Sequence, residues 1–210
     1  VGAWLLNEND PTSMRAFDSS LYANHGLVTG AQGRWQGRTF NGVNTWIDGG
    51  SSPSLNLYTA LTIITWAKRI ANAAHQVITC RRNNAAAEGG YLFWVNNDFG
   101  MLYFSRVTVA GDIDSGLTID SNWHFLAVTY DATNAIFYRD QTVSVKASAG
   151  VLNASPSRRQ TISSVAEDAV DWVWNGTIGG LFIFNRVLTA NDIQQLYISP
   201  YAPMGMKLFT

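Results

Sequence analysis

Hydrophobic and polar residues alternate with a period of two along most of the chain, which is typical of β-strands with one buried face. The segment 61–68 is also rich in β-branched and aromatic residues and is expected to be a strand. The segment 123–130 is apolar on both faces except for His124 and Thr129, which indicates a central strand packed on both sides. The last strong strand pattern covers residues 181–184.

Two hairpins are predicted where strand patterns flank short polar loops. The first joins residues 91–95 to residues 101–104, and the second joins residues 135–138 to residues 141–145. The loop of the second hairpin contains an Arg-Asp pair, and Gln141 follows it. Because glutamine tolerates a positive φ poorly, this loop should adopt a turn other than the usual two-residue primed turn.

One segment favours a helix. Thr189 can cap its N-terminus, and Asp192 stands three residues later, which is close to a capping box. The apolar residues that share one face at helical spacing are Ile193, Leu196 and Tyr197. Many short strands and one brief helix predict an all-β fold of two packed antiparallel sheets.

Composition limits the classes of function. The chain has 210 residues, of which 47% are hydrophobic and 14% are charged, so it can bury the core of one sizeable domain. Its 14 Lys and Arg residues are scattered rather than gathered in a basic stripe, so no nucleic-acid partner is expected. No apolar run reaches membrane-spanning length. Cys80 is the single cysteine, which excludes an internal disulfide and favours a small buried thiol.

Several short motifs occur in a specific order: Phe17-Asp18-Ser19-Ser20 with Asn24-His25-Gly26, Phe40-Asn41-Gly42-Val43, Trp66, Trp123-His124, and Asn185-Arg186-Val187-Leu188-Thr189. Together they resemble the laminin-G-like, concanavalin A-like jelly-roll family. The resemblance implies an all-β, two-sheet antiparallel jelly-roll sandwich with one short C-terminal helix, formed by a single domain over residues 1–203. Residues 204–210 would be a C-terminal tail, and an extracellular or virion-surface location is favoured.

The resemblance also implies a structural Ca²⁺ near the opening loop. Calcium binds six to eight oxygen atoms from carboxylates, amides and carbonyls. The candidate donors are Asp18, Asn24 and Asn41, with Asp168 or Asp171 reaching in from a later loop. The alternative is that Asp18 and Asn41 satisfy the backbone of their own turns, as Asp and Asn ordinarily do.

A carbohydrate site is a second candidate, because such sites combine aromatic faces with amides and carboxylates. Trp172 and Trp174 are spaced two apart and would lie on one side of an extended segment. Trp94 stands in the same relation to Asn96, and Arg106 is a further contributor. The predicted ligand-binding residues are therefore Trp172, Trp174, Asn175, Trp94 and Asn96. The alternative is that these tryptophans fill the core.

Catalysis is not expected. Glycoside hydrolysis requires two carboxylates about 5–10 Å apart, and none of the three Glu residues lies in a strand with alternating acids. The acidic cluster visible in the sequence is Glu167-Asp168 with Asp171, whose spacing is not that of an acid pair on one strand. The chain is therefore interpreted as a binding protein rather than an enzyme.

Two functions remain open. The first is a lectin-like adhesion module whose partner is a glycan or a protein surface. The second is a structural virion protein, such as a phage capsid decoration or tail component, that assembles through the jelly roll. The apolar segment 204–210 would then dock on a virion neighbour or on a second copy of the chain, because an exposed apolar tail is otherwise unfavourable.

Overall fold

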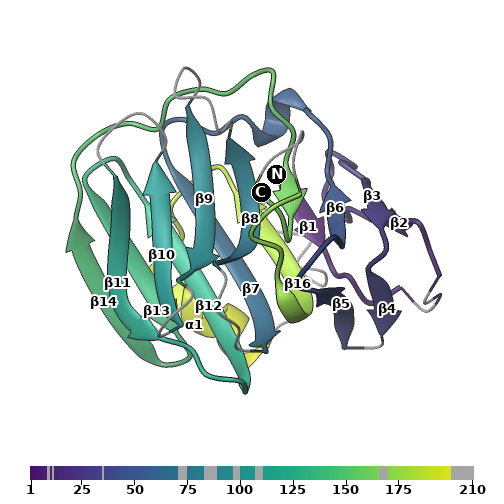
Figure 1. The fold of residues 1–210 in the computed structure, drawn as a ribbon. Coiled ribbons are helices and arrows are strands. Elements are labelled where there is room, and N and C mark those ends of the chain that lie inside the picture. The colour runs from purple at the N-terminus through teal and green to yellow at the C-terminus, as the bar shows by residue number, and fades with distance from the viewer. Residues whose placement is uncertain are drawn as a thin grey trace.

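The computed structural model describes residues 1–8, 10, 12–34, 36–70, 75–82, 89–96, 100–106, 111–165 and 170–199. In this part of the chain two antiparallel β-sheets pack face to face, and one α-helix lies outside them (Figure 1). The predicted two-sheet antiparallel jelly-roll sandwich with one short helix is confirmed. No helix of the described residues has the length and hydropathy needed to cross a bilayer.

Sheet A contains eight strands. They are β1 (Gly2–Trp4), β4 (Gln32–Arg34), β5 (Gly37–Asn41), β7 (Leu61–Arg69), β12 (Trp123–Tyr130), β13 (Asn134–Arg139), β14 (Thr142–Ala147) and β16 (Asn175–Phe184). Their order across the sheet is β14-β13-β12-β7-β16-β5-β4, and β1 pairs with β16 outside this path. Strand β16 therefore pairs with the first strand of the chain, β1, within one sheet.

Sheet B also contains eight strands. They are β2 (Arg15–Ala16), β3 (Gly26–Thr29), β6 (Trp46–Asp48), β8 (Gln76–Arg82), β9 (Gly90–Val95), β10 (Met101–Arg106), β11 (Asp112–Thr118) and β15 (Thr161–Ile162). Their order is β11-β10-β9-β8-β15-β6-β3-β2. A single 3₁₀ turn, Pro53–Leu55, follows β6.

The main core lies between the two sheets and consists mainly of the inward-facing residues, which alternate with outward-facing residues along each strand. Its largest fully buried apolar side chains include Trp4, Phe40, Phe93, Phe104 and Trp174. Burying one such side chain contributes about 1.5–3 kcal/mol. The alternation read from the sequence is thus the pattern that holds the sheets together.

Helix α1 (Ala190–Ile198) covers the outer face of sheet A. Its predicted capping box is present: Thr189 Oγ1 accepts the Asp192 N–H at 3.2 Å, and Asp192 Oδ2 accepts the Thr189 N–H at 2.9 Å. Ile193 and Leu196 are buried against the outward-facing Phe125 of β12 and its neighbours. Strand β12 is therefore packed on both faces, as its sequence predicts.

Both predicted hairpins form, one from β9 and β10 and one from β13 and β14. In the second hairpin Asp140 has a positive φ of 54°, whereas Gln141 does not. A type I′ turn needs a positive φ at both positions and is excluded, but a type II′ turn needs it only at the first position, so the expected departure from primed turns stays a prediction. Asp140 Oδ2 also accepts a hydrogen bond from His124 Nδ1 at 2.7 Å, which makes His124 a structural residue.

Candidate functional site

The outer face of sheet B carries a row of side chains that crosses four strands between β8 and β11. The strand register places Val77, Trp94, Tyr103 and Asp114 directly opposite one another. Side chains at opposed positions of neighbouring strands share one face of a sheet and lie about 4.5–5.5 Å apart at Cβ. The register alone therefore brings an aromatic pair next to a carboxylate.

Four rings meet on this surface, which we call the aromatic face: His75, Trp94, Tyr103 and Trp172. Trp94 stacks on Tyr103 with ring centroids 4.7 Å apart, and its centroid lies 5.2 Å from that of Trp172. His75 packs edge-on at 5.0 Å from Trp94 and 4.5 Å from Trp172. Trp94 is 4% exposed and supports the other three rings, which are half-buried and reach the surface.

Trp172 is held in an unusual backbone conformation. Its φ is +52°, in the left-handed region that a bulky residue rarely adopts. Two hydrogen bonds fix it there: its carbonyl accepts the Val77 N–H at 2.7 Å, and its N–H donates to Asp171 Oδ1 at 2.8 Å. Such strain persists where the surrounding structure imposes it and is concentrated at functional sites. The indole is thus presented beside β8 at a cost in backbone energy.

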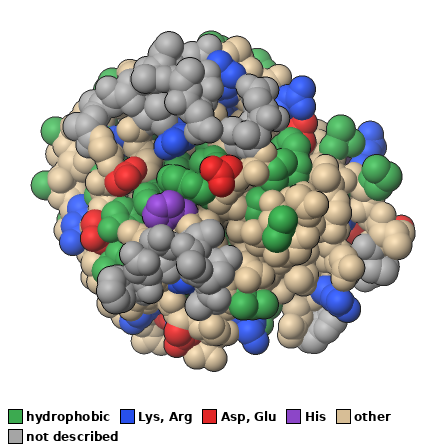
Figure 2. All heavy atoms as spheres, viewed as in Figure 1, with side chains coloured by type: hydrophobic (Ala, Val, Ile, Leu, Met, Phe, Trp, Pro, Cys, Tyr) green, Lys and Arg blue, Asp and Glu red, His purple; other side chains and the backbone are tan. Residues whose placement is uncertain are grey.

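Hydrogen-bonded carboxylates border the aromatic face. Trp94 Nε1 donates to Ser105 Oγ at 2.7 Å, and Ser105 Oγ donates to Asp112 Oδ1 at 2.5 Å. Tyr103 donates its phenolic hydrogen to Asp114 Oδ2 at 3.2 Å. Burial and the nearby Asp114 charge raise the pKa of Tyr103 above its ordinary value, so the phenol keeps its proton to a higher pH than a free tyrosine does. Figure 2 looks onto this side and shows a histidine and hydrophobic side chains with acidic side chains on either side.

The prediction that Trp172 and Trp174 share one side of an extended segment is wrong. Trp174 is fully buried in the core between the sheets, whereas Trp172 lies on the outer face of sheet B. The positive φ of Trp172 breaks the alternation on which the prediction relied. Trp174 also donates its N–H to Ser163 Oγ at 3.0 Å inside the core. The alternative, a core tryptophan, therefore holds for Trp174.

The other predicted ligand residues divide in the same way. Trp94 belongs to the aromatic face, and Asn96 interacts with the Tyr103 side chain there. Asn175 instead begins β16 in sheet A, opposite Asn41. Arg106 is 4% exposed and donates to Tyr130 Oη at 2.8 Å, so it serves the interior rather than the surface.

Sequence reasoning missed four members of the site, namely His75, Tyr103, Asp112 and Asp114. The last two are exposed acids that alternate along β11, so the segment 166–171 is not the one acidic cluster of the chain. Their spacing around Ile113 was a visible strand signal, and Tyr103 follows from the register of the β9–β10 hairpin. His75 carried no comparable signal.

The predicted calcium donors are already engaged by the backbone. Asp18 is 3% exposed, and its two carboxylate oxygens accept four hydrogen bonds from Ala3, Ser20 and Asn24. Asn41 Oδ1 accepts the N–H groups of two residues in its own turn. This is the arrangement of turn-stabilising side chains.

Asp171 likewise bonds to the adjacent Trp172 N–H. Among the described residues no group of three or more His, Cys, Asp or Glu side chains could hold a metal ion. Asp168 and the segment 204–210 lie outside the described residues, so the calcium site, the tail contact and the virion alternative stay predictions.

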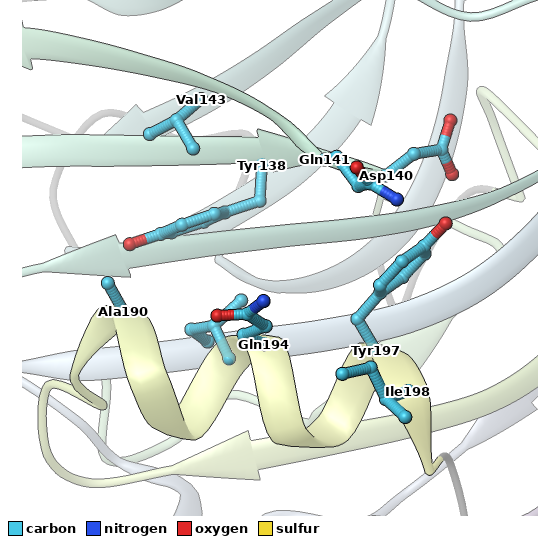
Figure 3. Close-up of a pocket in the computed structure, with 9 residues that line it drawn as sticks. Tyr138, Asp140, Gln141, Val143, Ala190, Gln194, Tyr197 and Ile198 are labelled. Carbon is cyan, nitrogen blue, oxygen red and sulfur yellow. The ribbon is translucent and has the colours of Figure 1, made fainter.

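A hollow lies between α1 and the β13–β14 hairpin on the opposite side of the molecule, with a volume of about 370 Å³. Figure 3 shows Tyr138 and Tyr197 at its two ends, with Gln194 between them. Its one carboxylate, Asp140, is occupied by His124 and by the Phe125 N–H at 3.0 Å. The groove thus combines two tyrosine rings with two glutamine side chains and one hydrogen-bonded carboxylate.

Comparison with protein families agrees with this architecture. The laminin G model described as the concanavalin A-like lectin/glucanases superfamily matches residues 41–194. The chain belongs to this superfamily. The match includes all four rings of the aromatic face and the β9–β10 and β13–β14 hairpins. No curated protein sequence matches this concanavalin A-like chain.

Solved structures share the fold at low identity. The Trypanosoma rangeli sialidase in complex with sialic acid is 13% identical, with a TM-score of 0.68 over 95% of this chain and 33% of the sialidase. The binding domain of botulinum neurotoxin DC in complex with SialylT is 15% identical, with a TM-score of 0.63 over 95% of this chain and 50% of that domain.

The Ruminococcus gnavus IT-sialidase CBM40 bound to alpha2,3 sialyllactose is 10% identical, with a TM-score of 0.58 over 67% of this chain and 83% of that module. The chain thus spans a third of the sialidase and half of the toxin domain. At these identities the likeness shows the fold alone.

Proposed function

We propose that this protein is a non-catalytic, lectin-like module that binds glycans on its aromatic face. The observation that carries the proposal is the meeting of His75, Tyr103 and Trp172 over the buried Trp94, next to exposed carboxylates. The apolar C–H face of a sugar ring packs on aromatic rings, and its hydroxyls donate to neighbouring carboxylates. Binding sites combine apolar surface with a few placed polar groups in this manner.

Two further points support the proposal. Structures that share the fold are complexes with sialic acid or sialyllactose, so the fold is compatible with glycan ligands. The strained backbone of Trp172 also fits a residue whose half-buried ring serves a function at the surface rather than stability.

A binding role is favoured over hydrolysis by the exposure of the acids. Asp112 and Asp114 both lie on the solvent side of β11. A general acid for glycoside cleavage needs a buried environment that keeps its proton at neutral pH. Exposed carboxylates that already accept hydroxyl hydrogens suit recognition instead. Incubating a bound glycan with the protein and analysing the products by mass spectrometry tests this, and cleaved product would overturn the non-catalytic role.

The decisive variant is Trp172→Gly, because glycine adopts the positive φ of this position without strain. A glycan array first identifies a ligand, and calorimetry then measures its affinity for the wild-type protein and the variant. Losing an indole contact of about 1.5–3 kcal/mol should weaken binding at least about ten-fold.

The matched control is Gln194→Trp, which fills the groove beside α1 and should leave the affinity unchanged. If Gln194→Trp loses binding while Trp172→Gly keeps the wild-type affinity, the site lies in the groove instead. A complete absence of binding across the array would overturn the proposed function.

A further inference from the structure

We propose that the aromatic face selects neutral glycans and disfavours glycans with carboxylates, such as those ending in sialic or uronic acids. This inference rests on the proposed glycan binding and concerns the charge of the ligand. It follows from which polar groups border the rings, independently of the ligands seen in proteins of similar fold.

The groups beside the rings are carboxylates, and each is tied to a ring or its support. Asp112 accepts from Ser105, which holds the Trp94 indole, and Asp114 accepts from Tyr103. Asp171 accepts from the Trp172 backbone. All three acids are exposed. An ionised carboxylate only accepts hydrogen bonds, so it matches sugar hydroxyls and amide N–H groups and repels a sugar carboxylate.

The nearby cations offset these acids only in part, because only one of the three nearby arginines, Arg82, lies at the rings. Arg81 and Arg106 are buried in the interior of the sandwich. The Arg82 guanidinium lies 6.0 Å from the centroid of Trp172 and is engaged with that ring. Lys146 comes from sheet A and reaches β11 at Gly116, where a Cβ added to the glycine would be 3.5 Å from the lysine Nζ. Among the described residues the carboxylates thus dominate the surface around the rings.

The expected size of the effect is moderate. Two like charges about 7 Å apart in a water-like dielectric repel enough to change affinity about three-fold. Two carboxylates acting together would change it about seven-fold on the same estimate. The effect should shrink at high salt, because exposed charges are screened.

The test uses a panel of glycans arrayed as pairs that differ only by a terminal sialic acid, including lactose and 3′-sialyllactose. In each pair that is bound, the neutral member should bind the wild-type protein at least about three-fold more tightly. The double variant Asp112→Asn with Asp114→Asn should remove most of this preference, because asparagine keeps an accepting oxygen without the charge. The two single variants replace it if the double variant fails to fold.

Asp10→Asn is the control, since Asp10 is an exposed acid near β2, at the other end of sheet B. It should leave the preference unchanged. Equal or tighter binding of the sialylated member by the wild-type protein would overturn the inference while leaving glycan binding intact. An unchanged preference in the Asp112 and Asp114 variants would overturn it as well. Binding of no glycan at all would instead remove the proposed function and the inference with it.

Discussion

Replacing Asp18 by asparagine separates the two roles considered for the opening loop, turn stabilisation and calcium binding. Asp18 Oδ1 accepts the N–H groups of Ala3 and Ser20 at 2.7 and 2.8 Å. Its Oδ2 accepts the Ser20 hydroxyl and the Asn24 N–H, both at 2.8 Å. Asp18→Asn preserves the shape of this side chain while replacing one accepting oxygen with a donor.

The loss of folding stability in Asp18→Asn can be estimated for each of these hydrogen bonds in turn. The amide oxygen of the variant keeps two of the bonds, and the Ser20 hydroxyl can rotate to accept from the new NH₂ group. The Asn24 N–H then faces a donor and is left unpaired at a residue only 8% exposed. An unsatisfied buried donor costs about 1–3 kcal/mol, and the loss of charge weakens the remaining bonds, so we expect a total of about 2–4 kcal/mol.

Urea unfolding followed by tryptophan fluorescence measures this difference, with and without calcium and with a chelator. The destabilisation should be the same in all three conditions. Asp10→Asn is the matched control, because Asp10 Oδ1 accepts two hydrogen bonds from Thr12 at an exposed position where an amide oxygen can do the same. Its unfolding midpoint should match that of the wild-type protein.

Two results would refute the reasoning. A change below about 0.5 kcal/mol for Asp18→Asn would mean that its four contacts are not worth what their burial indicates. Stabilisation of the wild-type protein by calcium that is lost in Asp18→Asn would show that this carboxylate binds the metal after all.

Two further predictions concern glycine substitutions and the stability of the protein at alkaline pH. Gly90→Ala should prevent folding or cost more than about 3 kcal/mol, because its φ is +120° and a Cβ would overlap the Arg81 carbonyl oxygen. Gly50→Ala, whose φ is +74° with no atom within 4 Å of a new Cβ, should cost only about 1–2 kcal/mol in urea unfolding; equal costs would contradict this account. Burial raises the pKa of Tyr91 above its ordinary value, so the unfolded chain releases this proton from about pH 10 while the folded chain retains it. The contribution of Tyr91 to the free energy of unfolding should therefore be fully present below pH 10 and fall above it by up to about 1.4 kcal/mol per pH unit. Unfolding curves between pH 8 and 11 measure this slope, which Tyr91→Phe should reduce. Identical slopes in the two proteins would contradict the prediction.

Much of the fold was predictable because its determinants are local. Period-two alternation predicted the strands, and the spacing of Thr189 and Asp192 predicted the start of the helix. The structure contains both hydrogen bonds of the predicted capping box. The central position of β12 was also predictable, since a strand that is apolar on both faces must be covered twice.

The aromatic face was less predictable because its determinants are tertiary. Because Trp172 has a positive φ, its side chain and that of Trp174 lie on opposite sides of sheet B. A tryptophan in the sequence does not indicate a positive φ, so this arrangement could not be predicted. Likewise, Asp114 meets Tyr103 only through the register of two strands joined by a loop. A single sequence specifies such a register through packing that emerges once the sheets are assembled.

The position of β16 has a consequence for synthesis of the chain. This strand lies between β7 and β5, and β1 also pairs with it, with Gly2 opposite Ile183. Until residues 175–184 leave the ribosome, β16 cannot connect the three remaining parts of sheet A, which are β1, the pair β4-β5, and the group β7-β12-β13-β14. Contacts between such distant residues form slowly because a long loop must close first. The apolar strands of the first half are thus exposed while the chain grows, and they depend on the timely arrival of its last strand.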